Sequence, residues 1–275
     1  MSNNRLPFTL AVQPWFKDHS VGGKIVLPAV ETMLLLAARC AAVHPDRDIR
    51  TMEDVHFGKF LEIPGAATTV PALVEWATDG DGRLQIKLLS QMQLGTMSRI
   101  KEHGEVFFPA SKPVSLPPPD TDPAPPVTPV KEIPVEHLYR QLVPFGKHYQ
   151  TLQDTLFLSK SGAWGKLKAP ELPFSDPVQA VLGSPFPLDG AMHAACVLGQ
   201  QFVDYPPFPV GFAKRSIYRP TGPGQEYLTR VTLKSLALGE LVFDLDIFNN
   251  IGQLYECVSG IRMRDVRRAI KKQAA

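Results

Sequence analysis

Proline is concentrated in one stretch of the chain, and this divides the sequence in two. Ten of the 27 prolines fall between Phe108 and Val135. Proline fixes its own φ and removes a backbone donor, so this stretch can form neither a helix nor an inner strand. We expect a semi-rigid extended linker over residues 109–134, with one folded unit before it (1–108) and another after it (135–275).

Both units have the same pattern of apolar residues. Pro28 precedes an apolar run over residues 29–43, and a second apolar run covers 187–203, so each unit is predicted to contain one helix buried on several sides. Strand-like runs follow at 51–63, 68–78, 84–93, 99–108, 211–219, 227–238, 241–248 and 254–264. This order indicates an α+β fold with antiparallel sheets and an internal duplication.

Composition excludes several classes of protein. The formal charge is +2, from 29 basic and 27 acidic residues, which does not suggest a nucleic-acid partner. Three cysteines are too few for a disulfide framework, which favours the cytoplasm. The apolar run from Met33 to Val43 contains Arg39 and is too short to span a bilayer, and the first residues show no signal peptide. We therefore expect a soluble cytoplasmic protein with no membrane partner.

Two short motifs stand at the starts of the two apolar runs. His19, Gly23 and Pro28 form H-x3-G-x4-P directly before the first run. Asp189 and His193 form D-x3-H at the start of the second, where a spacing of four places both side chains on one helical face. The two motifs thus occupy equivalent places in the two units.

Around these motifs the sequence resembles the dehydratase domains of polyketide synthases and related fatty-acid-type synthases. The segment QPWFKDHSVGGKIVLP (13–28) is similar to that family's HPWLADHRVGGRVLLPG, and SPFPLDGAMHAA (184–195) is similar to HPALLDAALQAA. PFGKHYQ (144–150) is similar to the family's Y-G-P-x-F-Q segment. The resemblance implies a double hotdog, in which two antiparallel sheets each wrap around a long buried helix.

The resemblance also implies an activity and the residues that carry it. His19 is the expected general base and Asp189 the expected general acid, with His193 orienting Asp189. Gly23, Pro28, Gly146 and Tyr149 are the expected supporting residues. The implied reaction removes water from a 3-hydroxyacyl thioester, which an acyl carrier protein presents on phosphopantetheine. This chain would bind no cofactor of its own, would work with separate synthase components, and could be a monomer or a homodimer.

The chemistry explains why these residue types are needed. Removal of an α-proton requires a base of near-neutral pKa, which imidazole provides. Loss of the β-hydroxyl requires a proton donor, and the apolar neighbours of Asp189 favour a protonated carboxyl. We expect backbone amides near Gly22 and Gly23 and at the helix start after Pro28 to hold the charge that develops on the thioester oxygen.

Two residues depart from the family pattern. Phe145 stands where the family has tyrosine, so a hydroxyl that could support Asp189 is absent, and Lys147 replaces the proline. Tyr149, at the family's phenylalanine position, is a candidate to compensate. These departures leave open reduced or abolished activity.

Simpler interpretations remain for several residues. Asp189 could cap its helix, His193 could be a core histidine, and Gly146 and Tyr149 could serve only a turn and the core. The remaining histidines show no metal-ligand spacing, and we expect no metal: His44, His56, His103, His137 and His148. Alternative functions on the same scaffold are a product-template-like cyclase, a hotdog thioesterase and a non-catalytic acyl-thioester binder.

Overall fold

The chain folds around one long antiparallel sheet. The structure, a computed structural model, describes residues 4–94, 97–110 and 131–266. The N-terminal half contributes β1 (Asn4–Ala11), β4 (Thr51–Phe57), β5 (Thr69–Thr78), β6 (Leu84–Leu94) and β7 (Met97–Phe108). The C-terminal half contributes β8 (Lys131–Pro134), β9 (Leu152–Leu158), β10 (Gly162–Lys168), β11 (Phe208–Ile217), β12 (Glu226–Ala237), β13 (Glu240–Phe248) and β14 (Leu254–Arg264). The strand order is β1-β5-β6-β7-β4-β11-β14-β13-β12-β10-β9-β8.

One strand pair joins the two halves. β4 and β11 run antiparallel from Thr51 opposite Ser216 to His56 opposite Gly211. The sequence predicts two sheets, one in each half, and the structure has both, but their edges at β4 and β11 are hydrogen-bonded to each other. Neither of these strands is left as an exposed edge that could pair with another chain.

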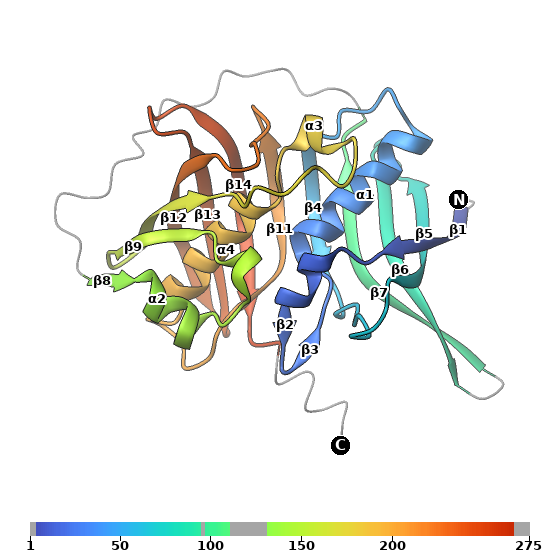
Figure 1. Cartoon of the computed structure of the whole chain (residues 1–275). Helices are drawn as coiled ribbons and strands as arrows, with labels where there is room; N and C mark the ends of the chain where they lie inside the picture. The colour runs from blue at the N-terminus through green and yellow to red at the C-terminus, as the bar shows by residue number, and fades with distance from the viewer. Residues whose placement is uncertain (1–3, 95–96, 111–130, 267–275) are drawn as a thin grey trace.

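Two buried helices lie against the sheet, one in each half (Figure 1). α1 (Ala29–Val43) packs on β6 and β7, and α4 (Phe186–Gly199) packs on β9, β10, β12 and β13. The two helices also touch each other. Every residue of α4 is buried, which agrees with its lack of a polar face. Among the described residues, no helix is both long and apolar enough to cross a membrane.

Short elements connect these layers. They are η1 (Pro14–Asp18), the hairpin β2 (Ser20–Val21) and β3 (Lys24–Ile25), α2 (Val135–His137), η2 (Leu138–Leu142), η3 (Lys147–Tyr149) and α3 (Gln179–Leu182). In chain order, η1 and the hairpin precede α1, whereas α2, η2 and η3 precede β9, and α3 precedes α4. The functional side chains described below come largely from these segments.

The structure refines the sequence-based boundaries. α1 has the predicted bounds, whereas α4 ends four residues earlier than predicted, at Gly199, a poor helix former. Residues 111–130 of the predicted linker lie outside the described part of the chain. The last residues assigned to that linker, Lys131–Pro134, form β8, the outermost strand of the sheet, where a proline can be accommodated.

A buried ion pair lies at the joint between the halves. Arg215 on β11 donates from Nε to Glu256 Oε1 at 2.7 Å and from Nη2 to Oε2 at 3.1 Å. Both residues are almost fully buried, at 2% and 1% exposure. The guanidinium Nη1 also lies 3.9 Å from the sulfur atoms of Met33 and Met52, which belong to the other half. Both charged residues therefore belong to the C-terminal half, and two methionines of the N-terminal half pack against the guanidinium.

Replacing Arg215 with methionine should lower the free energy of unfolding by about 3–5 kcal/mol, because Glu256 would keep a buried charge without a partner. Lys166→Met is the control, since Lys166 pairs with Asp154 at 2.9 Å on the surface and should cost about 1 kcal/mol or less. Urea unfolding of the three proteins measures both values. Equal losses for the two variants would contradict this account.

Candidate active site

A tight hairpin places His19. Gly22 and Gly23 form the turn between β2 and β3 with φ of +60° and +78°, the two positive values that a type I′ turn requires and that glycine adopts without strain. The turn brings Val26 back beside His19: the Val26 amide donates to the His19 carbonyl at 3.1 Å. In the motif, the residues between His19 and Gly23 are therefore those needed to form β2 and the start of the turn, so that the chain returns beside His19.

The same hairpin determines which nitrogen of His19 can act as a base. Nδ1 of His19 lies 3.3 Å from the carbonyl oxygen of Val26. A carbonyl can only accept, so the neutral ring carries its proton on Nδ1 and leaves the lone pair of Nε2 free. Burial lowers the pKa of His19 to about 4, although the nearby charge of Asp189 acts in the opposite direction. The imidazole is thus neutral, and able to accept a proton, at neutral pH.

The loop after η2 packs aromatic rings on His19. Phe145 stacks on the His19 ring with centroids 4.4 Å apart and an interplanar angle of 9°. It also stacks on His193 at 5.0 Å and 26°. Tyr149, fully buried, meets His19 edge-on at 5.2 Å. One phenylalanine therefore links a histidine of the N-terminal half to a histidine of α4.

A backbone contact fixes this loop relative to His19. The amide of Gly146 donates to the carbonyl of Asp18 at 2.7 Å, and a Cβ on Gly146 would lie 2.5 Å from Asp18 Cγ, so only glycine fits. The carboxylate of Asp18 accepts from the amide of His148 at 3.1 Å and lies 2.6 Å from His148 Nδ1. Since Asp18 directly precedes His19, these contacts hold the loop against the base.

Asp189 lies inside the first turn of α4. The N-cap is Pro185, so the alternative of Asp189 as a helix cap is wrong. The side chain is buried, and its Oδ2 lies 3.0 Å from Nε2 of His193, at an angle that does not yet make a hydrogen bond. The predicted placement of both side chains on one helical face is observed. Phe145 stacks on both His19 and His193, and His193 lies against Asp189, so the acid and the base share one buried cluster.

A second buried acid belongs to this environment and was not identified from the sequence. Glu31 in the first turn of α1 accepts a hydrogen bond from Trp15 Nε1 at 3.0 Å. Burial raises the pKa of Glu31 to about 7, the Trp15 bond opposes this, and the charge of Asp189 adds to it. The available signal was the single carboxylate in the mostly apolar run 29–43.

Three other predicted residues, Gly22, Gly23 and Pro28, have structural roles in the turn and at the helix start. Gly22 and Gly23 are exposed, and nothing lies within 4 Å of a Cβ built on either. Both glycines therefore lie at the surface in the turn of the hairpin, while His19 is buried, and the contact of their amides with the reacting thioester stays a prediction. Pro28 is the N-cap of α1, where its lack of an amide proton costs nothing.

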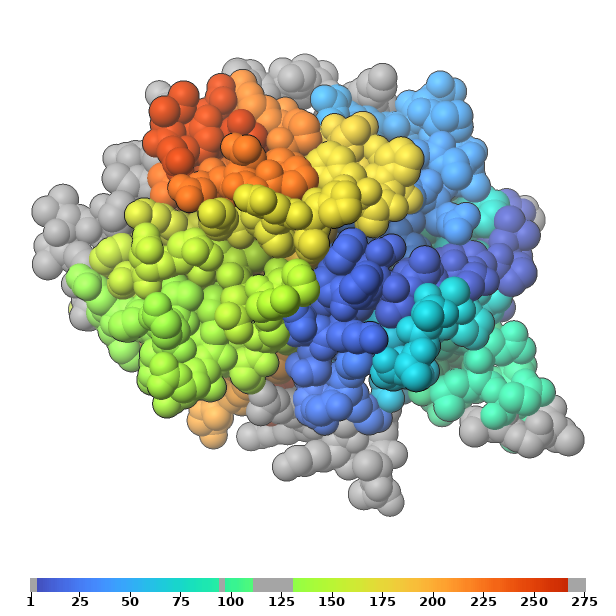
Figure 2. Space-filling model, viewed as in Figure 1, coloured from blue at the N-terminus to red at the C-terminus, as the bar shows by residue number. Residues whose placement is uncertain are grey.

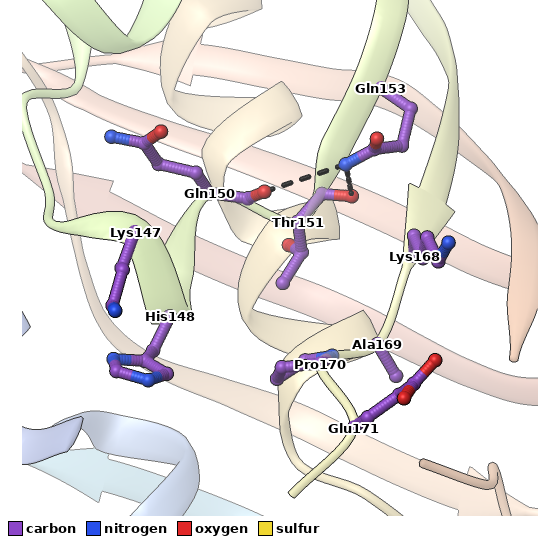
Figure 3. A pocket seen from close by; sticks show the side chains of 9 residues that line it. All are labelled: Lys147, His148, Gln150, Thr151, Gln153, Lys168, Ala169, Pro170 and Glu171. Carbon is purple, nitrogen blue, oxygen red and sulfur yellow. Dashed lines mark hydrogen bonds between the residues drawn. The ribbon is translucent and has the colours of Figure 1, made fainter. Parts of the chain in front are cut away.

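The site lies beneath the surface along the line where the halves meet. Figure 2 shows the blue N-terminal segment in direct contact with the green segment that begins at residue 131. A cavity of about 190 Å³ lies beside the 145–149 loop (Figure 3). It is lined by Lys147, His148, Gln150, Thr151, Gln153, Lys168, Ala169, Pro170 and Glu171. A second cavity, of about 440 Å³, lies against the paired strands β1 and β5, and neither includes His19 or Asp189.

Three residues in the described part of the chain lie close enough together to bind a metal ion, which the sequence did not reveal. Ligand atoms of His56, Glu102 and Glu105 lie within 4.8 Å of one another on the outer face of β4 and β7. Lys87 Nζ lies 3.2 Å from a carboxylate oxygen of each glutamate. The lysine already supplies the positive charge there, and the group is separate from the buried cluster around His19.

Comparison with known proteins agrees with the fold and with the family. The model described as "Polyketide synthase dehydratase N-terminal domain" matches residues 116–273, and the one described as "Polyketide synthase dehydratase domain" matches residues 5–91. No curated protein sequence matches the chain significantly.

Solved structures of low sequence identity share the architecture. A trans-AT PKS dehydratase domain from Brevibacillus brevis is 17% identical with a TM-score of 0.71, covering 95% of this chain and 93% of that one. The dehydratase domain of a mycocerosic acid synthase-like PKS is 13% identical with a TM-score of 0.74, covering 98% and 96%. A bifunctional dehydratase-cyclase domain in ambruticin biosynthesis is 19% identical with a TM-score of 0.70, covering 95% and 91%.

These structures confirm the α+β double hotdog, with its two helices buried against antiparallel sheets. Together with a family model that covers more than half of the sequence, they show that this chain belongs to the polyketide synthase dehydratase family.

Proposed function

We propose that this chain removes water from a 3-hydroxyacyl thioester, carried on the phosphopantetheine of an acyl carrier protein, and releases the 2-enoyl thioester. His19 is the base and Asp189 the acid. The observation that carries the proposal is the free Nε2 of a neutral, buried His19 in the same environment as a buried carboxyl whose Oδ2 has no hydrogen-bond partner among the described residues.

The proton and electron movements balance with these two groups alone. Nε2 of His19 takes the α-proton, and the electron pair of that C–H bond becomes the second bond between the α and β carbons. The bond from the β-carbon to its hydroxyl then breaks, and the hydroxyl leaves as water with the proton of Asp189. His19 ends protonated and Asp189 ionised, so proton exchange with solvent or a transfer back resets the pair.

The surroundings of His19 suit this role. Phe145 and Tyr149 exclude water from the ring and fix its plane, and the Val26 carbonyl fixes its tautomer. Charge that develops on the thioester oxygen would be favoured at the start of α1, where the first amides of a helix have no partner within it. The departure at Phe145 removes a hydroxyl and keeps an aromatic ring, which stacks on the base.

His19→Gln and Asp189→Asn should each lower turnover of a 3-hydroxyacyl pantetheine thioester by about 10²–10⁴-fold, the usual contribution of a general base or acid. His137→Gln and Asp154→Asn are matched controls, since both side chains are exposed and outside the site. Mass spectrometry of the acyl thioester gives the rates. Wild-type turnover in either site variant would remove that residue from the mechanism.

The identity of the product separates this proposal from the other reactions of the scaffold. Loss of water with the thioester intact supports the dehydratase. Release of the free acid would indicate a thioesterase, ring formation a cyclase, and binding without any change in mass an acyl-thioester binder. Each of these three outcomes would overturn the proposal.

The two strongly shifted pKa values make opposite contributions to stability. The pKa of His19 is 6.5 when unfolded and about 4 when folded, so the unfolded chain binds more protons between these values and stability rises with pH. The pKa of Glu31 is 4.5 when unfolded and about 7 when folded, so the folded chain binds more protons and stability falls as pH rises. The two effects are of similar size and largely cancel over the shared range.

Replacing one of the two residues should therefore make the effect of the other visible in the pH dependence of the free energy of unfolding. In Glu31→Gln the free energy of unfolding should rise by about 3 kcal/mol from pH 4 to 6.5, whereas in His19→Gln it should fall by a similar amount from pH 4.5 to 7. Urea unfolding at a series of pH values measures the slopes. Slopes unchanged from the wild type in both variants would contradict the buried, neutral state of this pair.

A further inference from the structure

Tyr139 in η2 contacts the acid side of the site through His193. Its side chain is buried, and its hydroxyl lies 3.4 Å from Nδ1 of His193, with the rings at 82°. The amide of Leu152 donates to the same hydroxyl oxygen at 2.9 Å. Because the oxygen already accepts from Leu152, the phenol proton is available to a neighbouring acceptor, and Nδ1 of His193 is in reach.

This arrangement selects one tautomer of His193. If Nδ1 accepts the phenol proton, a neutral imidazole must carry its own proton on Nε2. Nε2 is the atom that lies 3.0 Å from Oδ2 of Asp189, at an angle outside hydrogen-bond geometry in this structure. The proton on Nε2 is therefore beside Oδ2, and when the two groups engage, Oδ1 is the oxygen of Asp189 left to carry the acidic proton.

We propose that Tyr139 is a positioning residue for the acid: its hydroxyl fixes the tautomer of His193, which engages Oδ2 of Asp189 and leaves Oδ1 to carry the proton that departs with the β-hydroxyl. This inference rests on the proposed function. In the step itself, the Oδ1–H bond breaks, its proton joins the leaving hydroxyl, and the proton on Nε2 of His193 stays in place.

Two further observations agree with this role. Phe145 stacks on the His193 ring and limits its rotation, so the ring keeps the plane in which Nδ1 faces Tyr139 and Nε2 faces Asp189. Burial raises the pKa of Tyr139 above its usual range, so the phenol keeps its proton at neutral pH. Tyr139 thus supplies, through His193, a hydroxyl on the acid side of a site where Phe145 has none.

The first test is the protonation pattern of His193, read from its ¹⁵N chemical shifts and assigned with His193→Gln. We expect a ring protonated on Nε2 in the wild type and a shift toward protonation on Nδ1 in Tyr139→Phe. Tyr227→Phe is the matched control, because Tyr227 is also buried and its hydroxyl accepts a backbone amide, from Gly222 at 2.7 Å. An unchanged tautomer in Tyr139→Phe would overturn the proposal and indicate that Thr151, beside the same phenol, takes its proton.

The second test is a double-mutant cycle on turnover. Tyr139→Phe should lower kcat by about tenfold with little change in KM, the size expected for one lost hydrogen bond. In the His193→Gln background the same change should have little effect, because an amide side chain has a permanent donor and needs no tautomer selection. Tyr227→Phe should leave turnover unchanged in both backgrounds.

The outcomes distinguish the two proposals. An equal loss from Tyr139→Phe in both backgrounds would show a general structural role and overturn the inference. If the wild type produces no enoyl thioester, the proposed function fails, and the ¹⁵N measurement still decides whether Tyr139 controls the His193 tautomer.

Discussion

The site depends on a contact between two short segments from different halves of the chain. Asp18 and His19 come from the start of the N-terminal half, and the Phe145–Tyr149 loop comes from the start of the C-terminal half. The Gly146 amide bonds to Asp18, the two backbones approach too closely for a Cβ, and the rings of the loop then lie on His19. The pairing of β4 with β11 and the buried Arg215 pair keep the halves in the register that this contact needs.

Burial determines the electrostatics of the cluster. A histidine and a carboxyl removed from water both favour their neutral forms, which lowers the pKa of His19 and raises that of Glu31. The site therefore holds a buried histidine that is neutral and able to accept a proton at neutral pH. The neutral form also avoids the large cost of burying an unpaired charge. The same desolvation would strengthen any interaction with charge that develops on a bound thioester.

The sequence predicts what is local and misses what depends on distant contacts. α1 was predicted with its observed bounds because Pro28 and the apolar run determine it within a few residues. The hairpin turn at Gly22 and Gly23 is also local, but it was not predicted, and both glycines are exposed. The strands β1, β2, β3, β8, β9 and β10 were missed.

The candidate site shows the same division. His19, Asp189 and His193 could be identified from two motifs, and the structure brings them into one buried cluster. The roles of Glu31 and Tyr139 could not be predicted, because each depends on a partner outside its own segment: Trp15 for Glu31, and His193 for Tyr139. Phe145 was recognised only as a missing hydroxyl, since stacking on two histidines from different elements has no signature in sequence spacing.

The most direct test of the account follows both reacting bonds in one product. A 3-hydroxyacyl pantetheine thioester deuterated at the α-carbon is incubated with the wild-type protein, and the acyl product is weighed by mass spectrometry. The account predicts an enoyl thioester that has lost its hydroxyl and one α-deuterium together. An intact thioester that keeps all its deuterium, or a free acid that does so, would contradict it.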